Sequence, residues 1–222
     1  MGLMLAAILA FAGVAAVINV TPGLDTMLVL RTSVSGGRAA GLISGLGINA
    51  GCLAWGVAAA AGVTELLAAS HTAFETVRIA GAVYLTWLGC CALWRSRRGR
   101  AERAQAPEQA AETAEAPEPA TGTSRLAAFR SGLTTNLLNP KAGVFYMSLL
   151  PQFIPHGAPV FGTSMLLTLI DVTELLIWFL VLSAAASALS RRISRASFRR
   201  RMEQVSGLVF IGFAVNLAMD RS

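Results

Sequence analysis

Six apolar stretches limit what this 222-residue chain can fold into. A helix needs about 20 mostly apolar residues to cross the hydrocarbon layer of a bilayer. The stretches lie near residues 3–30, 39–63, 74–94, 127–150, 159–189 and 204–219. In lipid every backbone polar group needs a partner within the protein, which restricts spanning segments to helices and closed barrels. The sequence therefore predicts an all-α integral membrane protein with six transmembrane helices.

The composition agrees with a membrane protein. Hydrophobic residues make up 55% of the chain, against about 45–50% in soluble domains. The first 21 residues lack a basic start and an A-x-A cleavage site, which favours a membrane helix over a cleaved signal. The three cysteines lie in apolar stretches without C-x-x-C spacing (Cys52, Cys90 and Cys91), and there are only two histidines. We therefore expect packing cysteines, with no metal site and no cofactor.

Residues 96–124 differ from the rest of the chain. Arginines give way there to Ala, Pro and Glu, a composition that cannot bury enough surface to offset the cost of ordering. We expect a disordered cytoplasmic linker between two halves, residues 1–95 and 125–222. Each half then holds three of the six spans.

The positive charges predict the orientation of the helices. Lys- and Arg-rich loops stay in the cytoplasm, and 15 of the 18 Lys and Arg residues fall on one side of the six-helix arrangement. Both termini are then expected outside the cytoplasm. This distribution also accounts for the pI of about 10.2, so no nucleic-acid partner is expected. Because three is an odd number, the second half starts on the opposite side of the membrane, which predicts an inverted repeat, an arrangement common in secondary transporters.

A proline interrupts the first span of each half. The two breaks are Asn19-Val20-Thr21-Pro22-Gly23 and Leu137-Leu138-Asn139-Pro140-Lys141. Proline lacks an amide donor and clashes with the preceding turn. Irregular backbone at membrane depth is tolerated only where protein encloses it or where it lines a cavity. Pro22 precedes Arg31 by nine residues and Pro140 follows Arg130 by ten, so both breaks should lie at a similar, near-central depth.

Four charged residues are expected within the spans, where charge is costly and marks functional candidates. Asp171 and Glu174 are three residues apart, which places them on one helical face. Neighbouring carboxylates raise one another's affinity for a proton, which suits proton coupling; alternatively, Lys141 neutralises them to hold the bundle together. Asp25 fits either a helix N-cap or a substrate contact. Lys141 fits either an ion pair or direct contact with an anion.

The broken helices also suggest a class of substrate. A half-helix that begins after Pro22 or Pro140 offers unpaired amides and a positive dipole end, which suit a carboxylate. Unwound carbonyls and nearby acids suit an ammonium group. A small zwitterion meets both demands, and hydrated ions also match them.

Glycines follow four-residue spacings in the second span. They form the sets Gly37, Gly41 and Gly45, then Gly47 and Gly51. Such spacing allows a neighbouring helix to approach closely. We expect this helix in the interior of the bundle, although the same face also suits a homodimer.

Several motifs resemble those of the LysE-type translocators, the bacterial amino-acid exporters that include the homoserine and threonine resistance (RhtB) proteins. They are Asn19-x-x-Pro22-Gly23, the glycine-rich second span, Gly81-Ala82-Val83-Tyr84-Leu85 with Gly89, Asn139-Pro140-Lys141 followed by Pro151-Gln152-Phe153, and Gly207 with Gly212. The resemblance implies a transporter in the inner membrane, not an enzyme, which exports amino acids in exchange for protons. Two positions depart from the family pattern: Leu24 replaces a second proline, and residues 49–52 lack an acid that many members carry.

The residues and the resemblance together give a hypothesis of proton-coupled amino-acid export. The substrate-binding candidates are Asn19, Thr21, Pro22, Gly23, Asp25, Asn139, Pro140 and Lys141, and the proton-coupling candidates are Asp171 and Glu174. A cation exporter, for example for cadmium, is the nearest alternative. A thiol-redox conduit would need a cysteine in each half, and a non-transporting membrane subunit would use the breaks only structurally.

Overall fold

The elements of this chain are helices wherever its structure is described. The computed structural model describes residues 2–69, 124–155 and 157–186, with single residues 76, 79, 83, 86, 87, 89–91, 93, 94, 201, 204, 205, 207, 208, 211, 212 and 215. The elements are α1 (Gly2–Val20), α2 (Leu24–Ala69), α4 (Arg125–Leu137), α5 (Pro140–Val144), the π-helix η2 (Phe145–Leu149), the 3-10 helix η3 (Leu150–Phe153) and α6 (Val160–Ala184). The all-α prediction is confirmed for these residues. Most of the third and sixth expected spans, and residues 96–123 of the expected linker, lie outside them.

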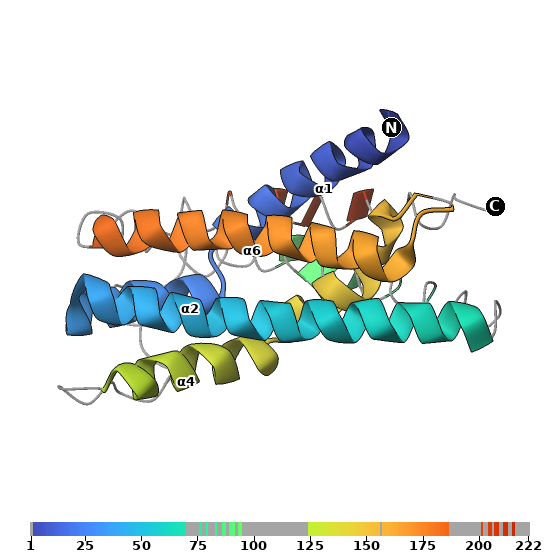
Figure 1. Ribbon diagram of the computed structural model, residues 1–222. Coiled ribbons are helices and arrows are strands. Elements are labelled where there is room, and N and C mark those ends of the chain that lie inside the picture. The colour runs from blue at the N-terminus through green and yellow to red at the C-terminus, as the bar shows by residue number, and fades with distance from the viewer. Residues whose placement is uncertain are drawn as a thin grey trace.

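The first expected span consists of α1 and the beginning of α2, separated by the break at residues 21–23. A second interruption lies within α2, where Gly37 has φ 81° and ψ 170°. This conformation is almost confined to glycine, and the chain reverses there into two arms, residues 24–36 and 38–69 (Figure 1). The expectation that Gly37 is a packing glycine is wrong, because an added Cβ would meet nothing within 4 Å. Gly37 forms the turn between the first two spans.

Substituting Gly37 by alanine is expected to destabilise the protein by about 1–3 kcal/mol, the usual cost of holding a non-glycine residue in such a conformation. Thermal unfolding in detergent measures the effect. Gly13→Ala is the matched control, since it adds the same methyl group to a helix at a position with nothing within 4 Å. Equal thermal-unfolding midpoints for Gly37→Ala and Gly13→Ala would contradict the turn assigned to Gly37.

The second arm of α2 packs between α4 and α6 through its glycines. An added Cβ at Gly45 would lie 2.9 Å from the Phe179 ring of α6, and one at Gly47 would overlap the backbone of Phe129 in α4. Such close backbone approach is what small residues permit in membrane helices. The prediction that this arm lies inside the bundle is confirmed. Because α4 and α6 cover its glycine face, a homodimer would have to use another surface.

The fourth span is longer and less regular than the sequence predicts. Ser124 caps the start of α4 by accepting a hydrogen bond from the Ala127 amide at 3.2 Å. After the break, α5 continues directly into η2 and η3 and ends at Phe153. The fifth span is present as α6, whose bounds fall inside the expected residues 159–189.

The two broken helices run in opposite directions, as an inverted repeat requires (Figure 1). The turn at Gly37, the start of α4 and the end of α6 lie at one end of the bundle, on the left of the figure. Arg31, Arg38 and Arg125 belong to the segments at this end. The full six-span repeat also needs the third and sixth spans, most of which lie outside the described residues, and the orientation toward the cytoplasm stays a prediction.

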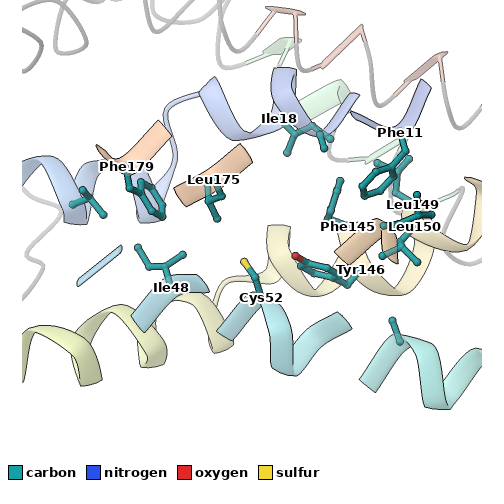
Figure 2. Packing of buried hydrophobic residues seen from close by; sticks show 14 of the residues in the cluster. Phe11, Ile18, Ile48, Cys52, Phe145, Tyr146, Leu149, Leu150, Leu175 and Phe179 are labelled. Carbon is teal, nitrogen blue, oxygen red and sulfur yellow. The ribbon is translucent and has the colours of Figure 1, made fainter. Parts of the chain in front are cut away.

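The helices have the length and surface expected in a bilayer. Among the described residues, α1, the stretch Leu24–Gly62 and α6 are long and apolar enough to cross a membrane. Their outward faces carry exposed leucines and isoleucines, such as Leu9 and Ile177. The buried core joins α1, both arms of α2, η2, η3 and α6, and it includes Phe11, Phe145 and Tyr146 (Figure 2). This core surrounds the place where the two breaks meet.

Candidate functional site

The two proline breaks meet around a small cavity within the bundle. It is lined by the end of α1, the start of α2, the second arm of α2, the second break, η2 and α6. Seven of the ten predicted site residues line it: Asn19, Thr21, Gly23, Asp25, Asn139, Lys141 and Asp171. The space open to the centre of a water-sized molecule is about 60 Å³. Residues that are distant in sequence thus share one site, an arrangement that agrees with the predicted similar depth of the two breaks.

Asp25 holds the second break with one of its two carboxylate oxygens. Its Oδ2 accepts hydrogen bonds from Asn136 Nδ2 at 3.0 Å and from Asn139 Nδ2 at 3.3 Å. Its Oδ1 is buried and has no partner among the described residues. The side chain therefore faces across the bundle, and the N-cap alternative does not describe it. An unpaired carboxylate oxygen beside a cavity is a strong acceptor for an ammonium group.

Lys141 reaches from the second break to the first helix. Its Nζ donates to the Ile18 carbonyl in the last turn of α1 at 3.1 Å, where a cation stabilises the carboxyl end of a helix. Lys141 also lies within electrostatic range of Asp25 and Asp171. It therefore balances the acids without an ion pair to Asp171 or Glu174 among the described contacts. Lys141, Asp25 and Asp171 line the same cavity, where opposite charges stabilise one another because little water is present.

The start of α5 is capped by its own asparagine. Asn139 Oδ1 accepts from the Lys141 amide at 3.0 Å, and the Asn139 carbonyl accepts from the Ala142 and Gly143 amides at 3.0 and 3.2 Å. Pro140 has no amide to offer. The expectation of unpaired amides at this end is therefore wrong for this conformation, because asparagine is a favoured N-cap.

Asp171 is the most enclosed acid of the site, with 2% of its surface exposed. Its Oδ1 accepts from Asn19 Nδ2 at 2.8 Å, and its Oδ2 accepts from the Tyr146 hydroxyl at 2.5 Å. Glu174 lies one turn further along α6 and does not line the cavity. Its Oε2 is buried without a partner among the described residues. The spacing of the pair is helical as expected, but only Asp171 faces the cavity.

The remaining predicted residues have structural roles in this conformation. Pro22 and Pro140 do not line the cavity; they interrupt the helices and so create it. The Thr21 hydroxyl donates to the Val17 carbonyl at 2.6 Å and satisfies the end of α1. Among the described side chains, no three His, Cys, Asp or Glu residues gather closely enough to hold a metal ion.

Three cavity residues escape the sequence reasoning. Asn136 is fully buried and contacts both Asp25 and the Cys52 sulfur, the latter at 3.4 Å. The sequence predicts that Cys52 is a buried packing residue. Cys52 is buried, and it also lines the cavity beside the Tyr146 hydroxyl (Figure 2). Tyr146 and Asn136 had a usable signal, since each is a polar side chain within a predicted span. The packing expectation is wrong for Cys90, which is exposed.

Comparisons with known proteins agree on one family. The family model of the LysE type translocators matches residues 16–221. A leucine efflux protein of Klebsiella pneumoniae is 32% identical over 212 residues, which cover 92% of this chain and 91% of that protein. A threonine efflux protein of Escherichia coli is 28% identical over 204 residues, which cover 90% and 92%.

A further relative is the uncharacterized membrane protein YrhP of Bacillus subtilis, 28% identical over 213 residues, which cover 96% of this chain and 99% of that protein. No solved structure matches the chain. The sequence relatives thus match nearly the whole chain.

Proposed function

Because this chain belongs to the LysE type translocator family, whose members are transporters and not enzymes, we propose that it exports amino acids or close derivatives from the bacterial cytoplasm across the inner membrane. The relatives named leucine and threonine efflux proteins support this class of substrate. One observation carries the proposal: two proline-broken helices meet around a cavity that holds Asp25, with a buried unpaired oxygen, together with Lys141.

The charges of the cavity fit a zwitterion. The ammonium group of an amino acid binds Asp25 Oδ1, which is buried and needs a donor. The carboxylate lies toward Lys141 and the amino end of α2, where the helix dipole is positive. The amides at the start of α5 are already paired with Asn139, so they contribute only if that cap opens. Asn19, Thr21 and Asn139 supply the remaining polar wall.

The cavity must enlarge during the transport cycle. A water molecule needs about 10–15 Å³ by the measure that gives about 60 Å³ here, so the cavity has room for a few waters. An amino acid the size of leucine needs more space than this. The conformation described is thus too narrow for the substrate, and transport requires the broken helices to separate alternately toward each side of the membrane.

Protons drive the export in this proposal, with Asp171 as the group that binds them. A carboxylate enclosed within a membrane span is costly, and such residues commonly form proton relays in transporters. Glu174 lies one helical turn away with an unpaired buried oxygen, so it can pass a proton to or from Asp171. Export of the substrate is then exchanged for entry of protons.

Liposome transport tests the proposal. Purified protein is reconstituted with a mixture of amino acids inside, a pH gradient is imposed, and the amino acids that leave are identified. We expect selective efflux that requires the gradient in the wild type, and loss of the gradient effect in Asp171→Asn and Glu174→Gln.

Thr173→Val is the control, since it alters an exposed side chain on the same helix whose hydroxyl contacts only the Leu169 carbonyl among the described hydrogen bonds. If the folded protein releases no amino acid from the liposomes, the export proposal is overturned. Gradient-dependent efflux that survives in both acid variants would overturn only the proton role of Asp171 and Glu174.

A further inference from the structure

Asp171 is the point at which the two broken helices are tied to a third helix. Asn19 belongs to the last turn of α1, just before the first break, and Tyr146 belongs to η2, just after the second break. Both donate to the same carboxylate of α6, one to each oxygen. Nearly all of this carboxylate is buried, so these two contacts replace its hydration. The position of each broken helix therefore depends on this carboxylate.

The contacts suit the ionised form of Asp171 best. An ionised carboxylate accepts at both oxygens and donates nothing, whereas a protonated one carries a donor on one oxygen. An amide N–H and a phenolic O–H both arrive as donors. On protonation the carboxyl loses its charge and one oxygen becomes a donor, so both hydrogen bonds weaken, because hydrogen bonds to an ionised group are the strong ones.

Tyr146 connects this carboxylate to an aromatic cluster made of Phe11, Phe145, Tyr146 and Phe153. The Tyr146 and Phe145 rings meet edge to face with centroids 5.1 Å apart. The Phe11 ring of α1 lies 5.8 Å from Phe145 and 5.3 Å from Phe153. Because Phe145 also lines the cavity, the cluster packs α1 against η2 at the cavity wall. Figure 2 shows Phe11 close to Phe145, on its upper right, with Tyr146 below Phe145.

The segment that carries Tyr146 departs from regular α-helical geometry. It is a π-helix, a rare form that commonly occurs at functional sites, followed directly by a 3-10 helix. Neither form keeps the regular α-helical hydrogen-bond pattern, so a change of winding there costs less than in a continuous α-helix. A small rotation of Tyr146 would displace Phe145 from Phe11.

Several charged or titratable groups face Asp171. They are Lys141 from the second break, Tyr146 from η2, Cys52 from the second arm of α2, Glu174 from α6 and, in the same cavity, Asp25 from the first arm of α2, while α1 presents only Asn19 among its described residues. Lys141 favours the ionised carboxylate, and Glu174 is positioned to deliver or receive the proton. Whether Asp171 is protonated or ionised therefore depends on the charged groups within the site.

We propose that Tyr146 and Asn19 make Asp171 a proton-sensitive latch, in which Tyr146 is a positioning residue that keeps the aromatic cluster closed while Asp171 is ionised. The role of the latch in transport rests on the proposed function, whereas its opening and closing need no substrate. Protonation of Asp171 releases η2, separates Phe145 from Phe11 and opens the cavity. Proton binding and access to the substrate site are thereby coupled through one hydroxyl group.

Cys52 is a native reporter for the latch. It lines the cavity with 4% of its surface exposed, and the chain has only two other cysteines. In the Cys90→Ser/Cys91→Ser protein, the rate of Cys52 labelling by a small maleimide is measured without substrate or gradient, across a range of pH. Each rate is divided by the rate of the same protein unfolded in detergent at the same pH, and the range is kept to about pH 8 and below, where the thiolate fractions of the two states change in the same proportion.

The normalised rate is expected to be low in the wild type at alkaline pH and to rise roughly tenfold or more on acidification, the factor that follows from loss of one hydrogen bond to a charged group. Tyr146→Phe, which keeps the ring and removes the hydroxyl, should label fast at every pH. Tyr84→Phe, at the other tyrosine of the chain, should behave like the wild type.

A labelling rate that is independent of pH in the wild type, or a Tyr146→Phe profile equal to the wild-type profile, would overturn the latch whatever the transport assay shows. A pH-dependent rate that Tyr146→Phe abolishes, in protein that moves no amino acid, would support the latch and overturn the proposed function. The two failures are therefore distinguishable.

Discussion

Asp25→Asn is expected to reduce amino-acid efflux in liposomes by roughly tenfold to a hundredfold, the value of one hydrogen bond between charged groups. Asparagine has nearly the same size and can still accept from Asn136 and Asn139, as Asp25 Oδ2 does. It lacks the negative charge that the substrate ammonium needs at Oδ1. The loss should therefore fall mainly on affinity, measured as a higher substrate concentration at half-maximal efflux.

Asp220→Asn is the matched control for this prediction, since it neutralises another aspartate close to the end of the chain. Thermal unfolding in detergent should give similar midpoints for wild type and both variants. Unchanged efflux by folded Asp25→Asn protein would show that the ammonium group binds elsewhere, and Asp171 would become the remaining cavity acid.

Gly47→Ala is expected to lower the stability of the bundle by about 1–3 kcal/mol, the usual cost of forcing extra atoms into a packed interior. The new methyl group would overlap the Phe129 carbonyl and lie 2.9 Å from the Leu133 amide nitrogen. Both are backbone atoms, so only a separation of α2 from α4 relieves the overlap. Thermal unfolding in detergent measures the loss.

Gly62→Ala serves as the comparison, because it adds the same methyl group to the same arm of α2, where the nearest atom is Met147 Cε at 3.9 Å. Efflux should fall in Gly47→Ala as well, since α4 leads directly into the second break and carries Asn136 against Asp25. Equal stability of the two alanine variants would contradict the contact between α2 and α4.

The sequence predicts the features of this site that depend on local chemistry. A proline within an apolar stretch must interrupt a helix, and a charge within a span must find a protein partner. These two rules were sufficient to select Asp25, Lys141 and Asp171, which the structure brings to one cavity. The four-residue spacing of the glycines also predicts that the second arm of α2 lies inside the bundle.

The sequence could not predict which atoms pair across the breaks. Lys141 could have formed an ion pair with an acid, but its Nζ donates to the Ile18 carbonyl, because α1 lies within its reach. Asn139 could have left the amides of α5 free, but its side chain folds back as a cap. Tyr146 carries a hydroxyl in an apolar stretch, a pattern that also fits ordinary packing, until Asp171 is seen opposite it. Each choice depends on tertiary geometry that one-dimensional spacing does not contain.

The mutual pairing of the two breaks has a consequence for the biogenesis of the protein. The hydrogen-bond partners of Asp25 are Asn136 and Asn139, which follow it by 111 and 114 residues. The partner of the Ile18 carbonyl is Lys141, which follows it by 123 residues. While the ribosome is still synthesising the second half, the first broken helix holds a carboxylate and a carbonyl that have yet to meet these partners. We expect the insertion machinery or water to shelter this helix until the second break arrives, so that the site is completed late in synthesis.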